Sequence, residues 1–410
     1  MAVRGAFRGE RRRDLILVST GTAVTWFGNS LAVLALMLVL RADGGFALAG
    51  MFLAESLPLF LVAPLAGLLV DRLPNRTLMI AAQFGQAAAT LGLALWQPNL
   101  AAVFGFSALL SAGNAIARPA AQSLVPVITG EERATRGYAW VSTGASTGLL
   151  LGAAAGGVLV AEFGPRTALL VDAITFTVQA GTLLLVRAER RPSRHPDRPK
   201  AGKEITAGLT FLINDRLLTA AILGIAATTF AGTVINVAEV FFITVTLRGS
   251  AVVLGLMQAM WMVGLLVGAR LAALISTTRG AAMMLACAVC VMGLAFALPS
   301  AFPMIAMLAV GYFIGGICNA IQNVSQSALI RARTPQEMRG RAFAGSGTAI
   351  NASNTVGSVL GGLLIGFTGA RGCFALAAGL CVVVGLILLA VNLRRSVPAV
   401  VEEQRTARTV

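Results

Sequence analysis

The chain has 410 residues, of which 57% are hydrophobic and only 12% are charged, and its mean hydropathy is +0.82. Soluble globular proteins carry roughly 25% charged residues, so this composition excludes a water-facing surface of normal polarity. The formal net charge is +15, but the basic residues are divided among short segments between long apolar runs. We therefore expect no nucleic-acid partner.

A helix that crosses a bilayer core about 30 Å thick needs roughly 20 apolar residues. Twelve stretches of the chain meet this requirement, and short polar segments separate most of them. In chain order the predicted spans are 15–40, 46–70, 78–96, 100–127, 138–160, 166–186, 217–243, 251–275, 281–299, 302–330, 342–367 and 373–391. We therefore expect an all-α membrane protein with twelve transmembrane helices, surrounded by a lipid bilayer.

The basic residues indicate the orientation of these spans. If both termini lie on one side of the membrane, most of the 32 Lys and Arg residues lie on that side too. The loops on the opposite side contain Arg41, Arg166, Arg248 and Arg371 and no other basic residue. Because basic loops favour the cytoplasmic side, we expect both termini in the cytoplasm and the chain in a bacterial inner (plasma) membrane.

One long polar segment divides the chain near its middle. Residues 187–203 are rich in Arg and Pro, a composition typical of a flexible linker rather than of a folded domain. The predicted organisation is a cytoplasmic N-terminus at 1–14, an N-terminal six-helix lobe at 15–186, a basic linker at 187–216, a C-terminal six-helix lobe at 217–391 and a cytoplasmic tail at 392–410.

The residues that enzymes use are scarce. His195 is the single histidine, so the sequence cannot supply a histidine-rich metal site, and its Pro- and Arg-rich surroundings do not suit a catalytic triad. The five cysteines lie in apolar stretches, and Cys287-x-x-Cys290 lacks a second pair of ligands, so we interpret them as buried thiols. The sequence has no phosphate-binding loop. We expect no enzymatic activity, no metal and no cofactor.

The second half of the sequence repeats a pattern of the first. Gly148, Gly152, Gly156 and Gly157 are followed 205 residues later by Ser353, Gly357, Gly361 and Gly362, and 205 is half of the chain length. A duplicated helical bundle of this hydrophobicity is typical of a two-lobed transporter, in which the substrate path runs between the lobes.

The loop after the second span carries a more specific motif. The sequence Gly67-Leu68-Leu69-Val70-Asp71-Arg72-Leu73-Pro74-Asn75-Arg76 resembles the cytoplasmic signature G-x-L-x-D-R-x-G-R-[RK] of the major facilitator superfamily, from which Pro74 and Asn75 depart. The resemblance implies that Gly67, Asp71, Arg72 and Arg76 form a conformational latch. In this latch Asp71 faces the positive N-terminus of span eleven; an ordinary solvated loop is the alternative.

Two further resemblances favour export. Span five is similar to the g-x-x-x-G-P-x-x-G-G signature of exporters in this superfamily, with Ala153 in place of proline. We therefore expect Gly148, Gly152, Gly156 and Gly157 to pack closely where the lobes meet, although this spacing also occurs in ordinary helix packing. The stretch from Arg118-Pro119 to Glu131-Glu132 is similar to the enterobactin-exporter and macrolide-efflux branch. The R-x-x-Q-G signature of proton-coupled drug exporters is missing, because Leu109 stands at the arginine position.

Ionisable residues inside the spans are candidates for coupling or substrate binding, since each costs about 2.5–3.5 kcal/mol to insert at a helix centre. Glu239 is the first candidate, because span seven lines the central cavity in the superfamily and this residue lies roughly 14 Å from the outer end. Glu55 is the second candidate and Arg118 the third. Asp172 lies nearer the outer end and can pair with Arg166. The alternative is local pairing without a transport role for the acidic residues, and snorkelling to the inner face for Arg118.

Polar residues complete the expected cavity, which the resemblance surrounds with spans one, four, seven and ten. The candidates in these spans are Asn29, Asn114, Asn236, Asn319, Gln322, Asn323 and Gln326. The last four share one helix face at i, i+3, i+4 and i+7. A polar face on a membrane helix meets either a wet cavity or a polar side chain of a neighbouring helix.

The sequence thus predicts a monomeric secondary transporter that exports a small molecule, such as a drug, an antibiotic, a siderophore or a secondary metabolite. Transport would proceed by alternating access, with protons as the expected coupling ion. A metabolite importer or facilitator is the alternative within transport. A membrane sensor or scaffold that transports nothing is the alternative from another class, but it would usually carry a sizeable soluble domain, and the short polar segments leave no room for one.

Overall fold

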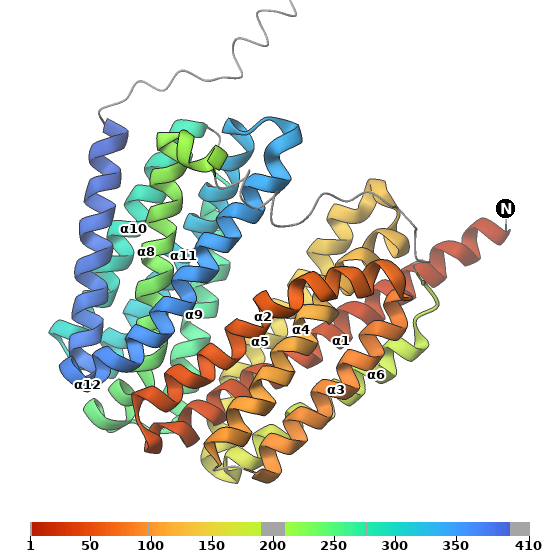
Figure 1. Ribbon diagram of the computed structural model, residues 1–410, viewed down its shortest axis with the longest axis horizontal. Coiled ribbons are helices and arrows are strands. Elements are labelled where there is room, and N and C mark those ends of the chain that lie inside the picture. Colours follow the sequence, from red (N-terminus) through yellow and green to blue (C-terminus); the bar gives the residue numbers. More distant parts are fainter. Residues whose placement is uncertain (1, 97–98, 190–209, 275–276, 394–410) are drawn as a thin grey trace, which may run out of the picture. The chain divides into compact units, whose positions relative to one another are not determined.

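The computed structural model of the chain describes residues 2–96, 99–189, 210–274 and 277–393, and every element in these ranges is a helix (Figure 1). The contacts divide the chain into two compact units. The first consists of Met1–Pro196 and Gly249–Ala259, and the second of Asp197–Arg248 and Met260–Val410. Most of the predicted linker and all but the first two residues of the predicted tail lie outside the described ranges.

The first unit contains six long helices, which run from red to yellow-green in Figure 1. They are α1 (Ala2–Leu40), α2 (Gly45–Arg72), α3 (Asn75–Trp96), α4 (Leu100–Thr129), α5 (Ala134–Phe163) and α6 (Pro165–Leu185), with the short 3-10 helices η1 (Arg41–Asp43) and η2 (Glu131–Arg133) between them. Helix α1 packs against α5 and α6, α3 packs against α4 and α6, and α2 packs against α4.

The second unit repeats this arrangement. Its helices are α8 (Arg216–Phe241), α9 (Ala251–Ala272, whose first residues belong to the first unit), α10 (Thr278–Ala301), α11 (Ile305–Arg333) and α12 (Arg339–Leu393), with the π-helical turn η3 (Phe242–Thr246) and the 3-10 helix η4 (Gln336–Met338). Helix α8 packs against α12, and α10 packs against α11 and α12. Because the same helix pairs recur in both halves, the packing follows the sequence repeat.

Ten helices in the described part of the chain are long and apolar enough to cross a membrane. The number is lower than twelve for two reasons. Helix α12 counts once, although it holds the predicted spans 342–367 and 373–391, which are separated by a non-helical Gly369 with φ +66°. Helix α2 enters only as the shorter apolar segment Gly45–Leu59. The all-α membrane architecture predicted from the sequence is therefore confirmed.

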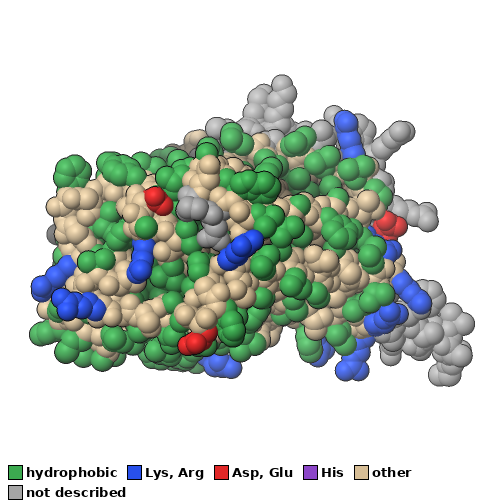
Figure 2. Space-filling view, turned by 90° about the horizontal axis from the view of Figure 1, so that it is seen from below, with side chains coloured by type: hydrophobic (Ala, Val, Ile, Leu, Met, Phe, Trp, Pro, Cys, Tyr) green, Lys and Arg blue, Asp and Glu red, His purple; other side chains and the backbone are tan. Residues whose placement is uncertain are grey.

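Large apolar side chains lie on the outside of both units, as expected for helices in lipid. Phe163 and Phe367 are 67% and 84% exposed, and Figure 2 shows hydrophobic side chains spread over the visible face with few charged ones among them. The interior is mainly apolar, with large buried side chains such as Phe176, and it also contains small and polar residues, including Gly152, Asp172 and Gln322. In a membrane, close backbone packing and hydrogen bonds between helices replace the hydrophobic effect as the source of association.

Candidate functional site

A buried carboxyl group joins two helices of the second unit. Glu239 of α8 is fully buried, and its carboxylate accepts a hydrogen bond from the hydroxyl of Tyr312 on α11. The Tyr312 ring lies edge-on to the indole of Trp261 on α9, with 6.0 Å between the ring centroids. A carboxyl group beside aromatic rings is suited to binding a cation or to exchanging a proton.

The local sequence explains how these three side chains meet. Glu239 lies near the end of α8, immediately before the π-helical turn η3, and such turns are frequent at functional sites. On α11 a side chain at Gly315 is impossible without movement, because a Cβ there would lie 2.6 Å from Cζ3 of Trp261. The glycine therefore leaves the space that the indole occupies next to Tyr312.

Tyr312 is a functional candidate that the pattern of charged and amide residues in the sequence does not reveal. The chain has only two tyrosines, and Tyr312 lies in the first third of α11 and is 4% exposed. A buried tyrosine hydroxyl normally has a hydrogen-bond partner. An isolated tyrosine in an apolar helix is thus the sequence feature that indicates a buried hydrogen-bond acceptor nearby, and in the structure this acceptor is Glu239.

The four amides of α11 divide into two pairs. Gln322 and Gln326 are buried and serve as links between helices: Gln322 accepts a hydrogen bond of 2.7 Å from Thr228 of α8, and Gln326 donates to Ser346 of α12. Asn319 and Asn323 are more exposed, and the Asn323 amide donates to Asn319. The asparagine pair is therefore the more accessible of the two.

The other cavity candidates lie at various depths. Asn114 and Arg118 of α4 and Asn236 of α8 are exposed, whereas Asn29 of α1 is half-buried. The Asn114 carbonyl accepts a hydrogen bond of 2.9 Å from Gln86 of α3. These positions lie in both units, and within each unit they are compatible with solvent access. Whether they line one cavity stays a prediction.

Glu55 is half-buried in α2, and it contacts α4 through its backbone, because the Ser111 hydroxyl donates to its carbonyl oxygen. Asp172 does not have the partner expected from the sequence. Its carboxyl group contacts the hydroxyls of Thr175 and Thr90, while Arg166 is exposed at the start of α6. The expectation that Asp172 pairs with Arg166 is therefore wrong, because the carboxyl group is buried against Thr90 of α3 and Thr175 of its own helix, whereas Arg166 is exposed.

The predicted latch is only partly within the described structure. The surroundings of Gly67 and Asp71 lie outside it, and Arg72 is exposed at the end of α2. Arg76 differs from the expectation, because its guanidinium donates to the carbonyl oxygens of Leu183 and Leu184 at the end of α6. Arginine commonly caps free carbonyls at a helix C-terminus, so Arg76 ties α3 to α6 within the first unit.

Asn75, which stands where the family signature has an arginine, is fully buried and donates to Ala120 and Ser123 of α4. The departure from the signature therefore has a structural role, because this side chain ties α3 to α4. The latch itself stays a prediction.

The glycine stripe of α5 packs within its own unit. A Cβ at Gly148 or Gly152 would collide with the backbone carbonyl of Ala23 or Phe27, both on α1, and a Cβ at Gly156 would lie 3.1 Å from Leu31. The expectation that these three glycines pack where the lobes meet is corrected accordingly. Their spacing lets α1 and α5 approach closely, because the backbones touch where side chains would otherwise separate them.

The second unit uses the repeated glycines in the same way. A Cβ at Gly357 would lie 3.0 Å from the carbonyl oxygen of Phe230, and one at Gly361 would lie 3.2 Å from Cα of Val234. Both contacts join α12 to α8.

Gly157 is different from its neighbours on α5, because its Cβ would lie 2.7 Å from the carbonyl oxygen of Ala251 at the start of α9.

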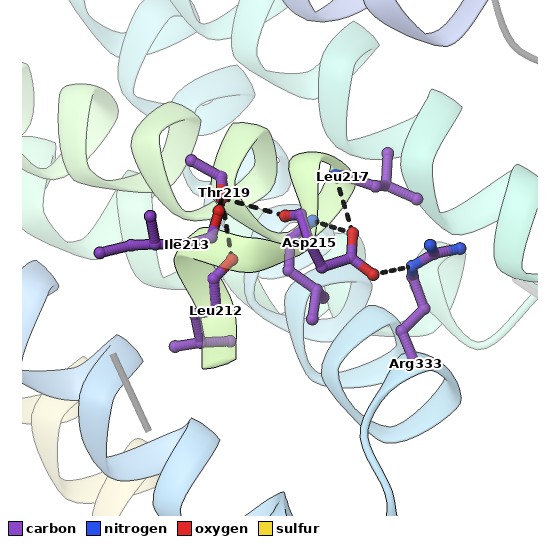
Figure 3. A network of polar contacts seen from close by, with 7 residues as sticks. Leu212, Ile213, Asp215, Leu217, Thr219 and Arg333 are labelled. Atoms are coloured by element: carbon purple, nitrogen blue, oxygen red, sulfur yellow. Dashed lines mark hydrogen bonds and ion pairs between the residues drawn. The ribbon is translucent and has the colours of Figure 1, made fainter. Parts of the chain in front are cut away.

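A polar network fixes the start of α8 (Figure 3). The Asp215 carboxylate accepts hydrogen bonds of 2.9 and 3.2 Å from the backbone N–H groups of Leu217 and Leu218, and it forms an ion pair of 2.6 Å with Arg333 at the end of α11. Thr219 donates to Leu212 and Asp215. The carboxylate thus caps one helix and binds the last turn of another.

The comparison with known families decides the identity of the fold. The family model described as Major Facilitator Superfamily matches residues 15–303 and 223–409. The chain belongs to this superfamily. It is therefore a transporter rather than an enzyme, and a protein that crosses the membrane many times, as the sequence analysis predicted.

Curated relatives of the chain include macrolide efflux proteins. The chain is 22% identical to Macrolide efflux protein A of Streptococcus pyogenes over 386 residues, which cover 91% of this chain and 94% of the relative. It is 23% identical to Macrolide efflux protein A of Enterococcus faecalis over 319 residues, which cover 75% of this chain and 97% of the relative. The resemblance to the macrolide-efflux branch is confirmed.

Solved structures agree on the fold. The nucleoside transporter NupG superposes with a TM-score of 0.75 at 13% identity, covering 92% of this chain and 98% of the transporter. A POT family transporter in complex with 5-aminolevulinic acid gives a TM-score of 0.72 at 12% identity, covering 93% of this chain and 96% of the transporter. At such low identity these similarities concern the fold and not the substrate.

Proposed function

We propose that the chain exports small-molecule drugs, with macrolide antibiotics as the substrate class, by alternating access and in exchange for protons. The observation that carries this proposal is the end-to-end similarity to Macrolide efflux protein A, which spans 91% of this chain and 94% of the relative. Because nearly all spans of both proteins align, the likeness includes the helices that would line a substrate path and is not confined to a common packing motif.

Glu239 supplies the chemistry that such exchange needs. A macrolide such as erythromycin carries an amine that is cationic at neutral pH, and a carboxylate can balance that charge or exchange it for a proton. The Tyr312 hydroxyl bound to Glu239 and the nearby Trp261 ring add a hydrogen-bond donor and an aromatic face. In this proposal the carboxyl group alternates between a proton and the cationic substrate.

The remaining parts of the proposal follow from the sequence. Export from a bacterial cell requires the plasma membrane, and the distribution of basic residues favours cytoplasmic termini. Asn29, Asn114, Asn236, Asn319 and Asn323 are the amides that we propose to contact the polar groups of the substrate, together with Arg118. Glu55 is the reserve candidate for coupling, and Asp71 remains the candidate for a latch that alternates with transport.

Accumulation of radiolabelled erythromycin in intact cells tests this function. Cells that express the protein should accumulate less label than cells with an empty vector, and a protonophore should remove the difference. Equal accumulation in both strains across a panel of macrolides would contradict the substrate class. Lower accumulation that persists with the protonophore would retain export and refute proton coupling.

The Glu239→Gln variant assigns the coupling role. The amide keeps the size of the side chain and still accepts the hydrogen bond of Tyr312, but it cannot cycle a proton. We expect normal abundance, loss of the difference in accumulation and survival of passive exchange of erythromycin between the two sides. Wild-type efflux in this variant would exclude Glu239 and make Glu55 the next candidate.

A further inference from the structure

A column of buried polar side chains fills the junction of α1, α3 and α6 in the first unit. Asp172 of α6 is 1% exposed, and Thr90 of α3 is fully buried. Gln86, one turn from Thr90 on α3, and Gln179, two turns from Asp172 on α6, are also buried, and Gln179 accepts a hydrogen bond from Thr25 of α1. The only ionisable group in this column is the Asp172 carboxyl group.

The fold does not require these polar residues, because the second unit builds the equivalent junction without them. The positions 205 residues later on α10 and α12 are Val291, Ala295, Ala377, Leu380 and Val384. Ala295 and Ala377 are buried like their counterparts Thr90 and Asp172. At the position of Asp172 the second unit thus packs its helices around a buried alanine, whereas Val291, the counterpart of Gln86, is 42% exposed. A buried carboxyl group, which is costly inside a membrane, is therefore not required for helix packing at this position.

The hydrogen bonds around Asp172 fit a carboxyl group that holds a proton. The Thr175 hydroxyl lies 2.7 Å from the carbonyl oxygen of Asp172 and 3.3 Å from its Oδ1. The Thr90 hydroxyl lies 3.0 Å from the carbonyl oxygen of Gln86 and 3.5 Å from Oδ2 of Asp172. Each hydroxyl has one proton, and its shorter contact is to the backbone. The hydroxyl oxygens therefore offer lone pairs, which a protonated carboxyl group can use as acceptors.

No other charge lies near this carboxyl group within the described helices that pack against α6. A Cβ at Gly28 of α1 would collide with Asp172 Oδ1, so the backbone of α1 covers that side. Among the residues of these helices whose side chains the structure describes, the other ionisable ones are Arg12, Arg13 and Asp14 of α1, Arg76 of α3, Arg136, Tyr138 and Glu162 of α5, and Arg166 of α6 itself. Arg76 and Asp14 bind the backbone at the end of α6, and the others are exposed.

The column also has a connection to the exposed surface of the unit. Gln86 donates to the exposed Asn114 of α4, and its own carbonyl oxygen Oε1 is buried without a hydrogen-bond partner, as is Oε1 of Gln83 one turn earlier. A buried amide oxygen normally has a partner, and a water molecule bound there would extend the chain of polar groups. Asn114, Gln86 and Thr90 thus mark a path from the surface to Asp172.

We propose that Asp172 is a second proton-binding site, located among the supporting helices of the first unit and reached through Gln86 and Asn114. The carboxylate accepts a proton that arrives through water, becomes a neutral carboxylic acid bound by Thr90 and Thr175, and later returns the proton to water by the same path. The inference rests on the proposed proton exchange for its role in transport, but the site itself does not depend on which substrate is carried.

Infrared difference spectroscopy of the purified full-length protein between alkaline and acidic buffer tests the site without any substrate. Wild-type protein should gain a carboxylic-acid C=O band on acidification that is missing in Asp172→Asn and retained in Glu239→Gln. Thr90→Val has nearly the same shape but removes one hydroxyl from Asp172, so the band should remain and change frequency. This second variant carries the test if Asp172→Asn is not recovered in folded form.

A band of constant size in both buffers, or spectra of Asp172→Asn identical to those of the wild type, would overturn the proposal, as would an unchanged frequency in Thr90→Val. This spectroscopic result is independent of the result of the erythromycin accumulation test. If the band behaves as expected but cells fail to export erythromycin, the site stands and the substrate class is wrong. If cells export erythromycin but the band is absent, the substrate class stands and the proposal that Asp172 binds a proton is wrong.

Discussion

Tyr312 contributes to the environment of Glu239, because its hydroxyl donates a hydrogen bond to this buried carboxyl group. A hydrogen bond to a charged group contributes about 1.5–3 kcal/mol, against about 0.5–1.5 kcal/mol for a neutral pair. The strength of the Tyr312 bond therefore depends on whether position 239 carries a carboxylate or an amide.

A double-mutant cycle measures this dependence. Tyr312→Phe removes the hydroxyl and keeps the ring beside Trp261. We expect it to lower the free energy of unfolding by about 1.5–3 kcal/mol in the wild type at alkaline pH and by about 1 kcal/mol in Glu239→Gln. Thermal unfolding of the four purified proteins provides the values. Equal losses in both backgrounds would contradict a charged partner for Tyr312.

The residues that sequence reasoning missed or misjudged share a physical reason. Charge and amide spacing can be read from a sequence, but the partner of a side chain depends on which helix lies opposite. Gln322 and Gln326 were correctly placed on one face of α11, yet only the structure reveals that this face meets Thr228 and Ser346. Likewise, the sequence marks Arg76 as part of a motif and cannot reveal that α6 ends beside it.

The glycines of α5 show the same limit at the level of a helix. The repeat of Gly148, Gly152 and Gly156 correctly indicated close backbone packing, since small residues four apart allow helices to touch. It could not indicate the partner, because such a stripe fits any neighbouring helix. The partner is α1 in the first unit and α8 in the second, so the exporter-like motif also stabilises each unit from within.

Alanine substitutions grade this contact. Gly148→Ala places a Cβ against the backbone carbonyl of Ala23, whereas Gly156→Ala places one 3.1 Å from a side-chain methyl group of Leu31. We expect a loss of folded protein for Gly148→Ala, a cost of about 1–3 kcal/mol that overpacking brings, and a smaller effect for Gly156→Ala.

Gly181 on α6 is the matched control, because nothing lies within 4 Å of its Cβ position. Gly181→Ala should be neutral or stabilising by about 0.5–1 kcal/mol. The yield of protein purified in detergent and the melting temperature of each of the three variants measure these effects. Equal melting temperatures would refute the close contact between α1 and α5.

The Asp215 network joins two helices of the second unit, and two substitutions separate its contributions. Asp215→Asn keeps a good N-cap but loses the ion pair with Arg333, whereas Asp215→Ala loses both. The cap contributes about 1 kcal/mol. Because both side chains are partly exposed, at 18% and 19%, the ion pair contributes about 1 kcal/mol or less.

We therefore expect the melting temperature of Asp215→Ala to fall further than that of Asp215→Asn, and high salt to lower the wild-type value toward that of Asp215→Asn. If Asp215→Asn and Asp215→Ala have the same melting temperature, the ion pair rather than the cap stabilises the start of α8.

At the scale of the whole molecule, hydrophobicity and the half-length repeat were sufficient to predict an all-α protein of two related halves. Each apolar run is long enough to cross a bilayer, and duplication leaves the same helix pairs in contact in both units. The substrate could not be predicted in this way, because it depends on a few polar side chains whose surroundings differ between the halves. The polar column around Asp172, with its apolar counterpart around Ala377, is the clearest difference.

The central claim, proton-driven export, is tested most directly in proteoliposomes. The initial rate of erythromycin uptake is measured with the lumen more acidic than the medium, without a pH difference and with the difference reversed. Protein-free liposomes are essential, because a weak base also collects passively in an acidic lumen. With an acidic lumen, we predict that the uptake rate of wild-type proteoliposomes exceeds the rates of protein-free liposomes and of Glu239→Gln proteoliposomes by at least about tenfold, a barrier difference of roughly 1.4 kcal/mol. Without an acidic lumen this difference should disappear. Rates that do not depend on the pH difference would indicate a facilitator, and faster uptake with the reversed gradient would indicate proton-coupled import; either result would contradict the claim.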